Sequence, residues 1–509
     1  MATAAIPQPR PVGAGTVIDK GLKTGALGYV SNVVIAVAST APAYSLAATL
    51  GFIAAVGGVG LQSPAILIVS FIPMLLIAQA YRYLNRADPD CGTTFAWATR
   101  ALGPGLGWLG GWAIIVSDVI VMANLAQIAG TYSFLLFRWQ SAAASIGAVT
   151  AVGVVWIVVM TWICYRGIEL SARLQSALLT TEVLTLAAFA VVALIKVYSG
   201  HPAGSIHFGL SWIDPLAIKS TGALVNGVLL GLFIYWGWDS GVAVNEESED
   251  SANGPGKAAV VSTLMLVLIY VIVSIAAQAY AGTGGLIANQ SDVLNFLGGK
   301  VFPRPLDLLL IVAVLTSASA STQTTILPTA RTTLSMARWG AVSKSFGRVH
   351  PRFQTPTFST VLMGVLSVIW FVAIVNLSSN VLADSVTALG FLIAFYYGLT
   401  GVACAVYYRR ELTRSAKNLV LLGMAPLLGG VMLLGIFVKA LFFYGNPDNT
   451  SSPGVFGIGV PVVVGVGSLV IGVVLMLVSR PIFPEFFARR TEVADPVLLA
   501  EVEAAGRAG

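Results

Sequence analysis

Histidine, cysteine and charged residues are all scarce in this chain of 509 residues, which contains three histidines, three cysteines and only 10% charged residues. The cysteines lie far apart, so no disulfide framework follows and we expect free thiols at Cys91, Cys164 and Cys404. The histidines fall in predicted loops and build no metal cluster with the cysteines. A membrane enzyme would need a nucleophile, base or metal cluster near an interface. We therefore expect no metal, no cofactor and no enzyme activity.

Hydrophobic residues make up 57% of the chain, which excludes a soluble domain. A helix needs about 20 apolar residues to span a bilayer. About twelve such runs predict an all-α polytopic membrane protein. They lie near 27–52, 63–81, 105–136, 144–165, 171–197, 222–244, 257–281, 305–330, 357–376, 385–408, 418–443 and 456–479.

The charges predict the orientation of the chain in the lipid bilayer. Lys and Arg total 28 against 22 Asp and Glu, and roughly 22 of the basic residues fall on one side, including those after the eighth span, Arg331 and Arg338. The orientation of the protein in the membrane explains this excess of basic residues, so no nucleic-acid partner is expected. We predict a cytoplasmic N-terminal tail (1–26), a transmembrane domain (27–480) and a cytoplasmic C-terminal tail (481–509), in the cell membrane and without a removable signal peptide.

Two of the apolar runs are interrupted at mid-span, by VASTAPAYS at 37–45 and by IYWGWDSG at 234–241. Backbone groups freed inside a bilayer must find partners, so such breaks line a cavity or are buried in protein. Paired breaks in corresponding parts of two halves indicate the binding site of a secondary transporter. The first ten spans then form two five-helix units, inferred to be inverted repeats from the positions of the breaks, followed by two further helices.

Three carboxylic acids lie inside predicted spans: Asp118, Glu182 and Asp239. Each costs roughly 2.5 to 3.5 kcal/mol at a helix centre, so they should face the bundle interior or a wet cavity. An apolar surrounding favours the neutral acid, which makes these groups candidates for carrying protons during coupling or gating. The alternative is a structural hydrogen bond to freed backbone or to a neighbouring helix.

Hydroxyl and aromatic side chains cluster in two spans. In the eighth span, Ser317 and Ser321 are one helical turn apart and could supply ligands to a sodium ion, or could serve only as close-packing contacts between helices. In the sixth span, Phe233, Tyr235 and Trp236 surround the break at mid-depth. This depth favours a gate or a pocket wall for a substrate ammonium group over an interfacial aromatic belt.

Four stretches resemble the amino acid, polyamine and organocation superfamily of permeases: ASTAPAYS; PDCGTTFAWATRALGPGLGWLGGW; FIYWGWDSGVAVNEESED with the following GKA; and TARTTLSMARWGAVSKSFGRVHPRFQTPTFST. The resemblance covers nearly the whole chain. It implies a LeuT-like fold of twelve helices in which the unwound parts of helices 1 and 6 hold the carboxylate and amino groups of the substrate.

The resemblance also implies roles for single residues. It places Ser39, Thr40 and Ala41 at the family's small-residue amide nest, Phe233 to Gly237 on the opposite wall of the pocket, and Asp239 near the inner gate. Glu182 stands where some members carry a lysine that replaces a sodium ion and is linked to proton coupling, with Ser317 and Ser321 beside it. Pro42 departs from the family pattern, since a proline donates no amide.

These observations predict a secondary active transporter that imports an amino acid or a related amine such as a polyamine by alternating access. Its coupling ion is expected to be the proton, with sodium as the other candidate. An ion-independent exchanger is the alternative within transport. Outside transport, a channel would need a filter segment, which is not seen here, whereas only flux measurements separate a carrier from a sensor that does not transport.

Overall fold

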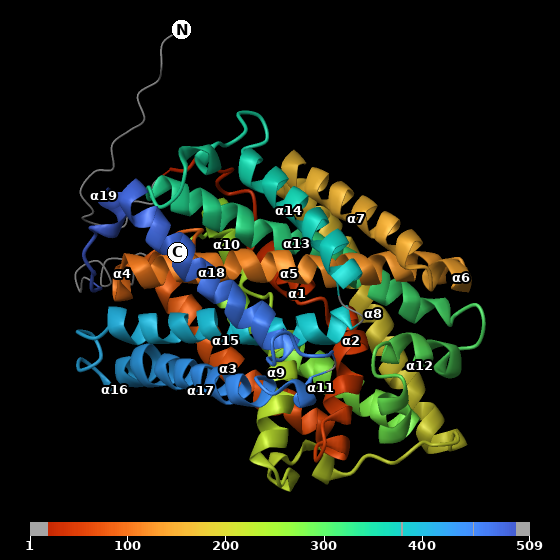
Figure 1. The fold of residues 1–509 in the computed structure, drawn as a ribbon. Helices are drawn as coiled ribbons and strands as arrows, with labels where there is room; N and C mark the ends of the chain where they lie inside the picture. The colour runs from red at the N-terminus through yellow and green to blue at the C-terminus, as the bar shows by residue number, and fades with distance from the viewer. Residues whose placement is uncertain (1–18, 378–379, 451, 495–509) are drawn as a thin grey trace.

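The computed structural model describes residues 19–377, 380–450 and 452–494, and in these ranges the chain is almost wholly helical (Figure 1). Twelve helical stretches there are long and apolar enough to cross a membrane, which confirms the predicted all-α polytopic class. They are formed by α1 (Tyr29–Ser39) with α2 (Pro42–Ala55), α3 (Ser63–Ala87), α5 (Pro104–Leu136), α7 (Ile146–Arg166), α8 (Ile168–Gly200), α9 (Thr221–Tyr235) with α10 (Ser240–Ala243), α11 (Gly254–Ala288), α13 (Leu308–Arg338), α14 (Thr357–Leu377), α15 (Val381–Tyr407), α17 (Ala425–Tyr444) and α18 (Val460–Ile482).

Shorter helices occupy the connections. The α-helical ones are α4 (Thr94–Leu102), α6 (Gln140–Ala143), α12 (Val293–Val301), α16 (Ala416–Asn418) and α19 (Pro484–Phe487). Six 3-10 turns are η1 (Gly60–Gln62), η2 (Leu210–Ile213), η3 (Pro215–Ala217), η4 (Asn245–Glu247), η5 (Lys344–Gly347) and η7 (Pro447–Asn449), and η6 (Leu419–Met424) is a π-helix.

The eighth span differs from its prediction. It was expected to end near residue 330, with Arg331 and Arg338 in the following loop, but α13 continues to Arg338. The Arg331 side chain is buried and donates two hydrogen bonds of 2.9 Å, from Nε and Nη2, to the carboxylate of Glu247. Because a buried charge is tolerated when it is paired and hydrogen-bonded, the helix can run on past this arginine.

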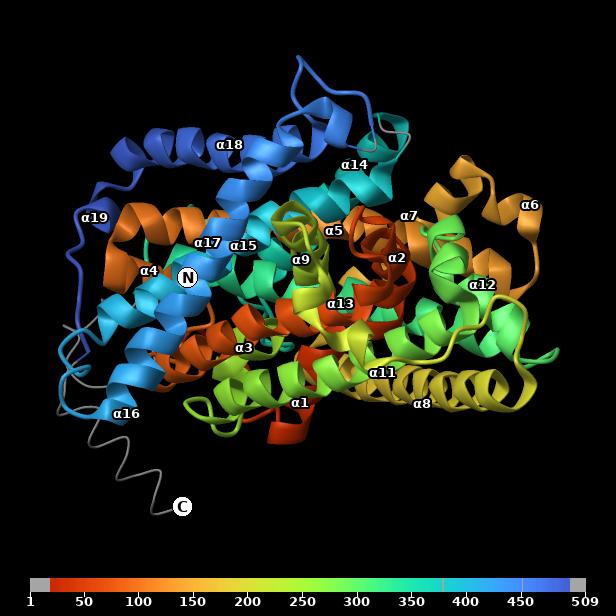
Figure 2. The ribbon, with the colours of Figure 1, turned by 90° about the horizontal axis from the view of Figure 1, so that it is seen from below.

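The two ends of the helix bundle are distinct. Figures 1 and 2 both place α4, α16 and α19 at one end and α6 and α12 at the other. We call the first end the tail face, because the described chain enters there through residues 19–28, and we call the opposite end the far face.

Both predicted helix breaks are present. The first separates α1 from α2 at Thr40 and Ala41, where Ala41 has φ +48° and Pro42 begins α2. Proline suits this position because the first turn of a helix leaves its amides without intrahelical partners. The second break, at 236–239, contains Gly237 with φ +117°, and a Cβ atom there would lie 2.7 Å from the carbonyl oxygen of Ser39. A glycine at 237 therefore lets the two breaks touch.

The half-helices on either side of the breaks pack crosswise. α2 lies against α9, and α1 lies against α10. A hydrogen bond of 2.7 Å between the hydroxyls of Ser39 and Ser240 joins the two breaks directly. Helices α8 and α13 flank the first break, because both contact α1 and α2.

Candidate functional site

The backbone amides of the first break already have acceptors within the protein. Thr40 and Ala41 donate to the carbonyls of Val37 and Ala38, at 3.2 and 3.1 Å, which completes the last turn of α1. Ser45 donates to the carbonyl of Ala41 at 2.8 Å, as the first regular bond of α2. The amide nest expected at Ser39, Thr40 and Ala41 is therefore occupied by protein groups.

The two remaining amides, those of Ala43 and Tyr44, face side chains from neighbouring helices. Ala43 donates to Oε1 of Glu182 at 2.6 Å, and Tyr44 donates to the hydroxyl of Ser317 at 3.1 Å. Ser317 in turn donates to the same Glu182 oxygen at 2.8 Å. A carboxylate at a helix N-terminus is stabilised by the free amides and by the positive end of the helix dipole. Glu182 thus caps α2 from α8.

Glu182 is fully buried and its two oxygens are unequal. Oε1 accepts both hydrogen bonds, whereas Oε2 has no hydrogen-bond partner among the described residues. The structure thus brings together Glu182 and Ser317, as the sequence analysis expected, and adds Ala43. Ser321, one turn along α13, instead donates to the carbonyl of Ser39 at 2.8 Å, at the C-terminal end of α1.

Asp239 lies at the second break and is held by two tyrosines of α15. Tyr397 donates to Oδ1 at 2.9 Å and Tyr396 donates to Oδ2 at 3.1 Å, while the indole of Trp236 donates to the Tyr396 hydroxyl. Asp239 is only 5% exposed. The sequence analysis missed both tyrosines, although buried tyrosine hydroxyls generally need a partner and a tandem pair inside an apolar run could have signalled one.

Asp118 is buried on α5 and accepts a hydrogen bond of 2.6 Å from the hydroxyl of Thr329 on α13. Helix α5, which carries Asp118, packs against α15, which carries the two tyrosines that hold Asp239. Two of the three predicted acids therefore share one region, whereas Glu182 lies behind the first break.

The predicted aromatic wall divides into two parts. The ring of Phe233 meets that of Tyr44 edge-on, with centroids 6.2 Å apart, so these two side chains link the ends of α9 and α2. Tyr235 packs instead against Phe71 of α3 and Tyr270 of α11, with centroids 6.1 and 5.1 Å away. The structure therefore places Phe233 between the two breaks and turns Tyr235 toward other helices.

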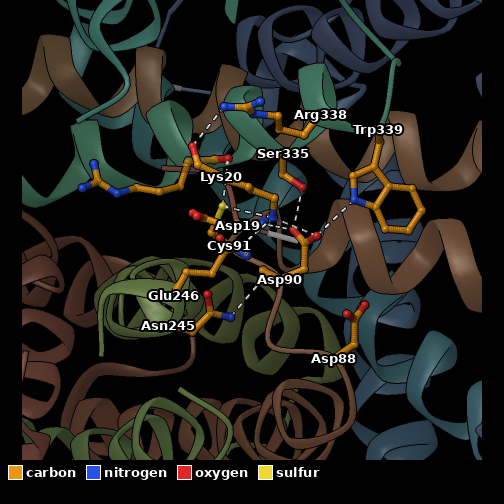
Figure 3. Close-up of polar contacts among 12 residues, drawn as sticks. Asp19, Lys20, Asp88, Asp90, Cys91, Asn245, Glu246, Ser335, Arg338 and Trp339 are labelled. Atoms are coloured by element: carbon orange, nitrogen blue, oxygen red, sulfur yellow. Dashed lines mark hydrogen bonds and ion pairs between the residues drawn. The ribbon is translucent and has the colours of Figure 1, made fainter. Parts of the chain in front are cut away.

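A buried cluster at the tail face surrounds the ammonium group of Lys20 (Figure 3). Its Nζ lies 2.5 Å from Oε1 of Glu246, 2.9 Å from Oδ2 of Asp90 and 3.6 Å from Sγ of Cys91. Asp90 also accepts hydrogen bonds from Ser335 at 2.5 Å and from the indole of Trp339 at 3.0 Å. The cluster joins the entering chain, the segment before α4, the end of the sixth span and α13.

Electrostatics keep this cluster charged. Burial alone would lower the pKa of Lys20, but Asp90, Cys91 and Glu246 outweigh it and raise the pKa well above its ordinary value. Burial alone would raise the pKa of Asp90, but Lys20 and hydrogen bonds from Ser335 and Gly92 lower it to about 2. For Glu246, burial prevails over Lys20 and raises the pKa. Lys20 and Asp90 therefore form a lasting ion pair.

The ligand atoms of Asp90, Cys91 and Glu246 lie within 4.8 Å of one another, a grouping that could hold a metal ion. The sequence analysis weighed histidine and cysteine alone and missed this grouping. The Lys20 ammonium already supplies a positive charge to all three side chains. The Lys20 ammonium thus explains why the side chains of Asp90, Cys91 and Glu246 lie together.

Residues 19–28, which we call the tail strap, close the tail face. Ala26 and Leu27 donate their amides to the carbonyl of Glu247 at 2.8 and 3.0 Å, and the Arg338 guanidinium donates to the carbonyl of Lys20 at 3.1 Å. α1 begins directly after the strap. Any movement of α1 at this end must therefore disturb these contacts.

The far face is hollowed instead. A cavity of about 480 Å³ lies between the outer ends of α2, α9, α15 and α17. Its wall includes Phe52, Asn226, Leu230, Asp384 and Tyr444. Leu230 is three residues from Phe233 on α9, so the cavity approaches the breaks to within about one helical turn, and no residue of either break lines it.

Comparison with known proteins agrees with this architecture. The family described as "Amino acid permease" matches residues 27–396. The chain is similar to the low-affinity putrescine importer PlaP of Escherichia coli, with 21% identity over 380 residues, covering 73% of this chain and 79% of that protein. It is also similar to the vacuolar cationic amino acid transporter 4 of Arabidopsis thaliana (26% over 372 residues; 68% and 58%). A third relative is the arginine/ornithine antiporter of Latilactobacillus sakei (22% over 397 residues; 73% and 80%).

Proposed function

Because this chain belongs to the amino acid permease family of membrane transporters, we propose that it imports an amino acid or a related amine by alternating access, driven by protons. The observation that carries the proposal is the contrast between the two ends of the bundle. The far face has a cavity whose wall includes Leu230, one helical turn from Phe233, while the tail strap seals the tail face. This is the arrangement expected of one of the two end states of a carrier.

The orientation of the protein in the membrane is a further part of the proposal. Basic residues gather at the tail face, and the cytoplasmic side of a membrane protein carries the excess of Lys and Arg. We therefore assign the tail face and both termini to the cytoplasm, in the cell membrane. The structure then corresponds to a state that is hollowed on the outside and sealed on the cytoplasmic side, with the breaks themselves buried. The crosswise packing of the breaks supports two inverted five-helix units, α1 to α8 and α9 to α15.

Glu182 is the proposed proton carrier. Its buried Oε2 oxygen has no hydrogen-bond partner in the part of the chain that the structure describes, while Oε1 is held by Ala43 and Ser317. A proton on Oε2 removes a buried charge without breaking either bond to Oε1. Because both bonded groups belong to helices at the first break, the protonation state of Glu182 is positioned to bias the movement of α1 and α2.

The proposal is tested with purified protein in liposomes under an inward proton gradient, with radiolabelled amino acids and diamines. Wild-type protein should accumulate substrate, and Glu182→Gln should reduce accumulation to the level without a gradient. Glu485→Gln, the same substitution at an exposed position, is the matched control. Undiminished gradient-driven accumulation by Glu182→Gln would show that Glu182 is not the proton carrier.

The alternative is exchange without a coupling ion, which the similarity to an arginine/ornithine antiporter favours. Wild-type protein would then show counterflow between internal and external substrate but no accumulation under the proton gradient. The same liposomes distinguish the two mechanisms.

A further inference from the structure

Resting on the proposed function, we infer that the transported substrate is a cationic amine without a carboxylate group, and that Glu182 excludes amino acids. The inference concerns the substrate class of the site between the two breaks. It follows from which polar groups around the breaks are already occupied and from the charges that remain.

The first step is the state of the α2 N-terminus. The N-termini of half-helices in transporters point at anionic substrate groups, because their free amides and positive dipole end attract a negative charge. Here every amide from Thr40 to Ser45 has an acceptor in the protein, and Pro42 has no amide to give. A substrate carboxylate would have to displace the carboxylate of Glu182 from Ala43.

The second step is that the cap does not depend on the charge of Glu182. Oε1 accepts from Ala43 and Ser317, while Oε2 is the oxygen left for a proton. A neutral Glu182 keeps an acceptor on the amide of Ala43. Proton uptake during the transport cycle therefore does not open the α2 N-terminus to a carboxylate.

The third step is the charge of the surrounding helices. Four of the surrounding membrane segments, 29–55, 104–136, 221–243 and 382–407, contain three carboxylates, Asp118, Asp239 and Asp384, and not one Lys or Arg. The two helices that also flank the first break, α8 and α13, do carry basic residues, and the buried one, Arg331, is paired with Glu247. Asp239 lies at the second break, where Tyr396 and Tyr397 donate to it. The carboxyl groups of these segments offer hydrogen-bond acceptors to an ammonium group, whereas none of the four segments supplies a Lys or Arg to pair with a substrate carboxylate.

The fourth step is the supply of groups that bind an ammonium. The hydroxyl of Tyr44, which is 1% exposed, has no hydrogen-bond partner among the described residues and belongs to the ring that faces Phe233 between the breaks. Tyr396 and Tyr397 contact Asp239 through their hydroxyls, and Trp236 donates to the Tyr396 hydroxyl, so aromatic side chains lie beside this carboxyl group. Aromatic rings and carboxylates together suit an organic cation.

The experiment uses pairs of compounds that differ only in a carboxylate: putrescine and ornithine, cadaverine and lysine, agmatine and arginine. Initial uptake rates are measured with wild-type protein in liposomes, with the remaining standard amino acids as competitors. The amine of at least one pair should exceed its amino acid in kcat/KM by on the order of 100-fold, because the amino acid leaves a buried carboxylate without donors.

Two variants separate this inference from proton coupling. Glu182→Gln keeps an acceptor oxygen for Ala43 and should keep the preference for amines while losing the response to the proton gradient. Glu182→Ala frees the amide of Ala43 and should narrow the preference by about tenfold or more, since a carboxylate can then bind there. Thermal unfolding of each variant checks that it is folded. If Glu182→Ala is not folded, the kcat/KM ratios of the amine and amino acid pairs in wild-type protein decide whether the substrate lacks a carboxylate.

The outcomes are distinct. Transport of any standard amino acid with a kcat/KM equal to or above that of the amines overturns the inference and leaves the proposed transporter standing. A wild-type protein that transports none of these compounds overturns the proposed function and the inference with it. Equal loss of amine preference in Glu182→Gln and Glu182→Ala would show that charge alone, and not the cap, sets the substrate class.

Discussion

Lys20 and Glu246 are 226 residues apart in the sequence and form a buried ion pair, with Nζ 2.5 Å from Oε1. The pair fastens the tail strap to the end of the sixth span. The strap itself leads directly into α1. In the transport cycle that we propose, the tail face opens and this pair separates. Its strength therefore contributes to the barrier between the two end states.

Replacing Lys20 should loosen the tail face. Lys20→Ala leaves Glu246 and Asp90 buried without their cation, which costs roughly 3 to 5 kcal/mol. In a Cys164→Ala, Cys404→Ala background, Cys91 should react with a maleimide at least about tenfold faster than in the parent protein. Lys23→Ala is the control, because Lys23 and Glu169 form an exposed pair worth about 1 kcal/mol or less. Equal reactivity in both variants would show that Lys20 does not hold the tail face closed.

Asp90 should make stability depend on pH in a defined window. Its folded-state pKa of about 2 lies below the unfolded value of about 3.9, so its stabilisation is complete above that value and is lost as the pH falls through about 2. Asp90→Asn should therefore be less stable than wild type by about 2 kcal/mol near neutral pH, and the two unfolding curves should converge near pH 2. Exposed Asp448→Asn is the control. A constant difference across this range would contradict the assignment.

Gly237→Ala should impair transport without requiring any change in a charged group. Its φ of +117° disfavours any side chain, and its Cβ would lie 2.7 Å from the carbonyl oxygen of Ser39. The combined strain is about 2 kcal/mol or more and pushes the two breaks apart. Gly467→Ala on α18, where a Cβ meets nothing within 4 Å, is the matched control. Uptake rates and thermal unfolding of both variants are compared, and similar values would contradict the close approach of the breaks.

Tyr397→Phe should weaken the second break. The change removes the hydroxyl that donates to Oδ1 of Asp239 at 2.9 Å and leaves a buried carboxylate oxygen without that donor, at a cost of about 1 to 3 kcal/mol. We expect kcat/KM for uptake to fall by about tenfold. Tyr198→Phe, at a tyrosine that is 52% exposed, is the control. Uptake as fast as in this control would mean that Tyr397 does not support Asp239.

The sequence by itself determined the membrane-spanning architecture and the places where it is interrupted. A bilayer requires about 20 consecutive apolar residues per helix and penalises freed backbone groups. The local composition of the chain is therefore sufficient to locate the spans and the breaks. The same penalty singled out Asp118, Glu182 and Asp239 as buried acids. The end of α13 was misplaced because local composition does not reveal that Glu247 neutralises Arg331.

Only the tertiary structure decided which hydrogen-bond or ion-pair partner each buried charged side chain has. Glu182 finds the amide of Ala43, Asp239 finds Tyr396 and Tyr397, and Lys20 finds Glu246, across 139 to 226 residues of sequence. Helix periodicity fixes which residues of one helix share a face, but hydrogen-bond partners depend on how separate helices cross and at what height. That arrangement results from the packing of the whole bundle, and no local pattern encodes it.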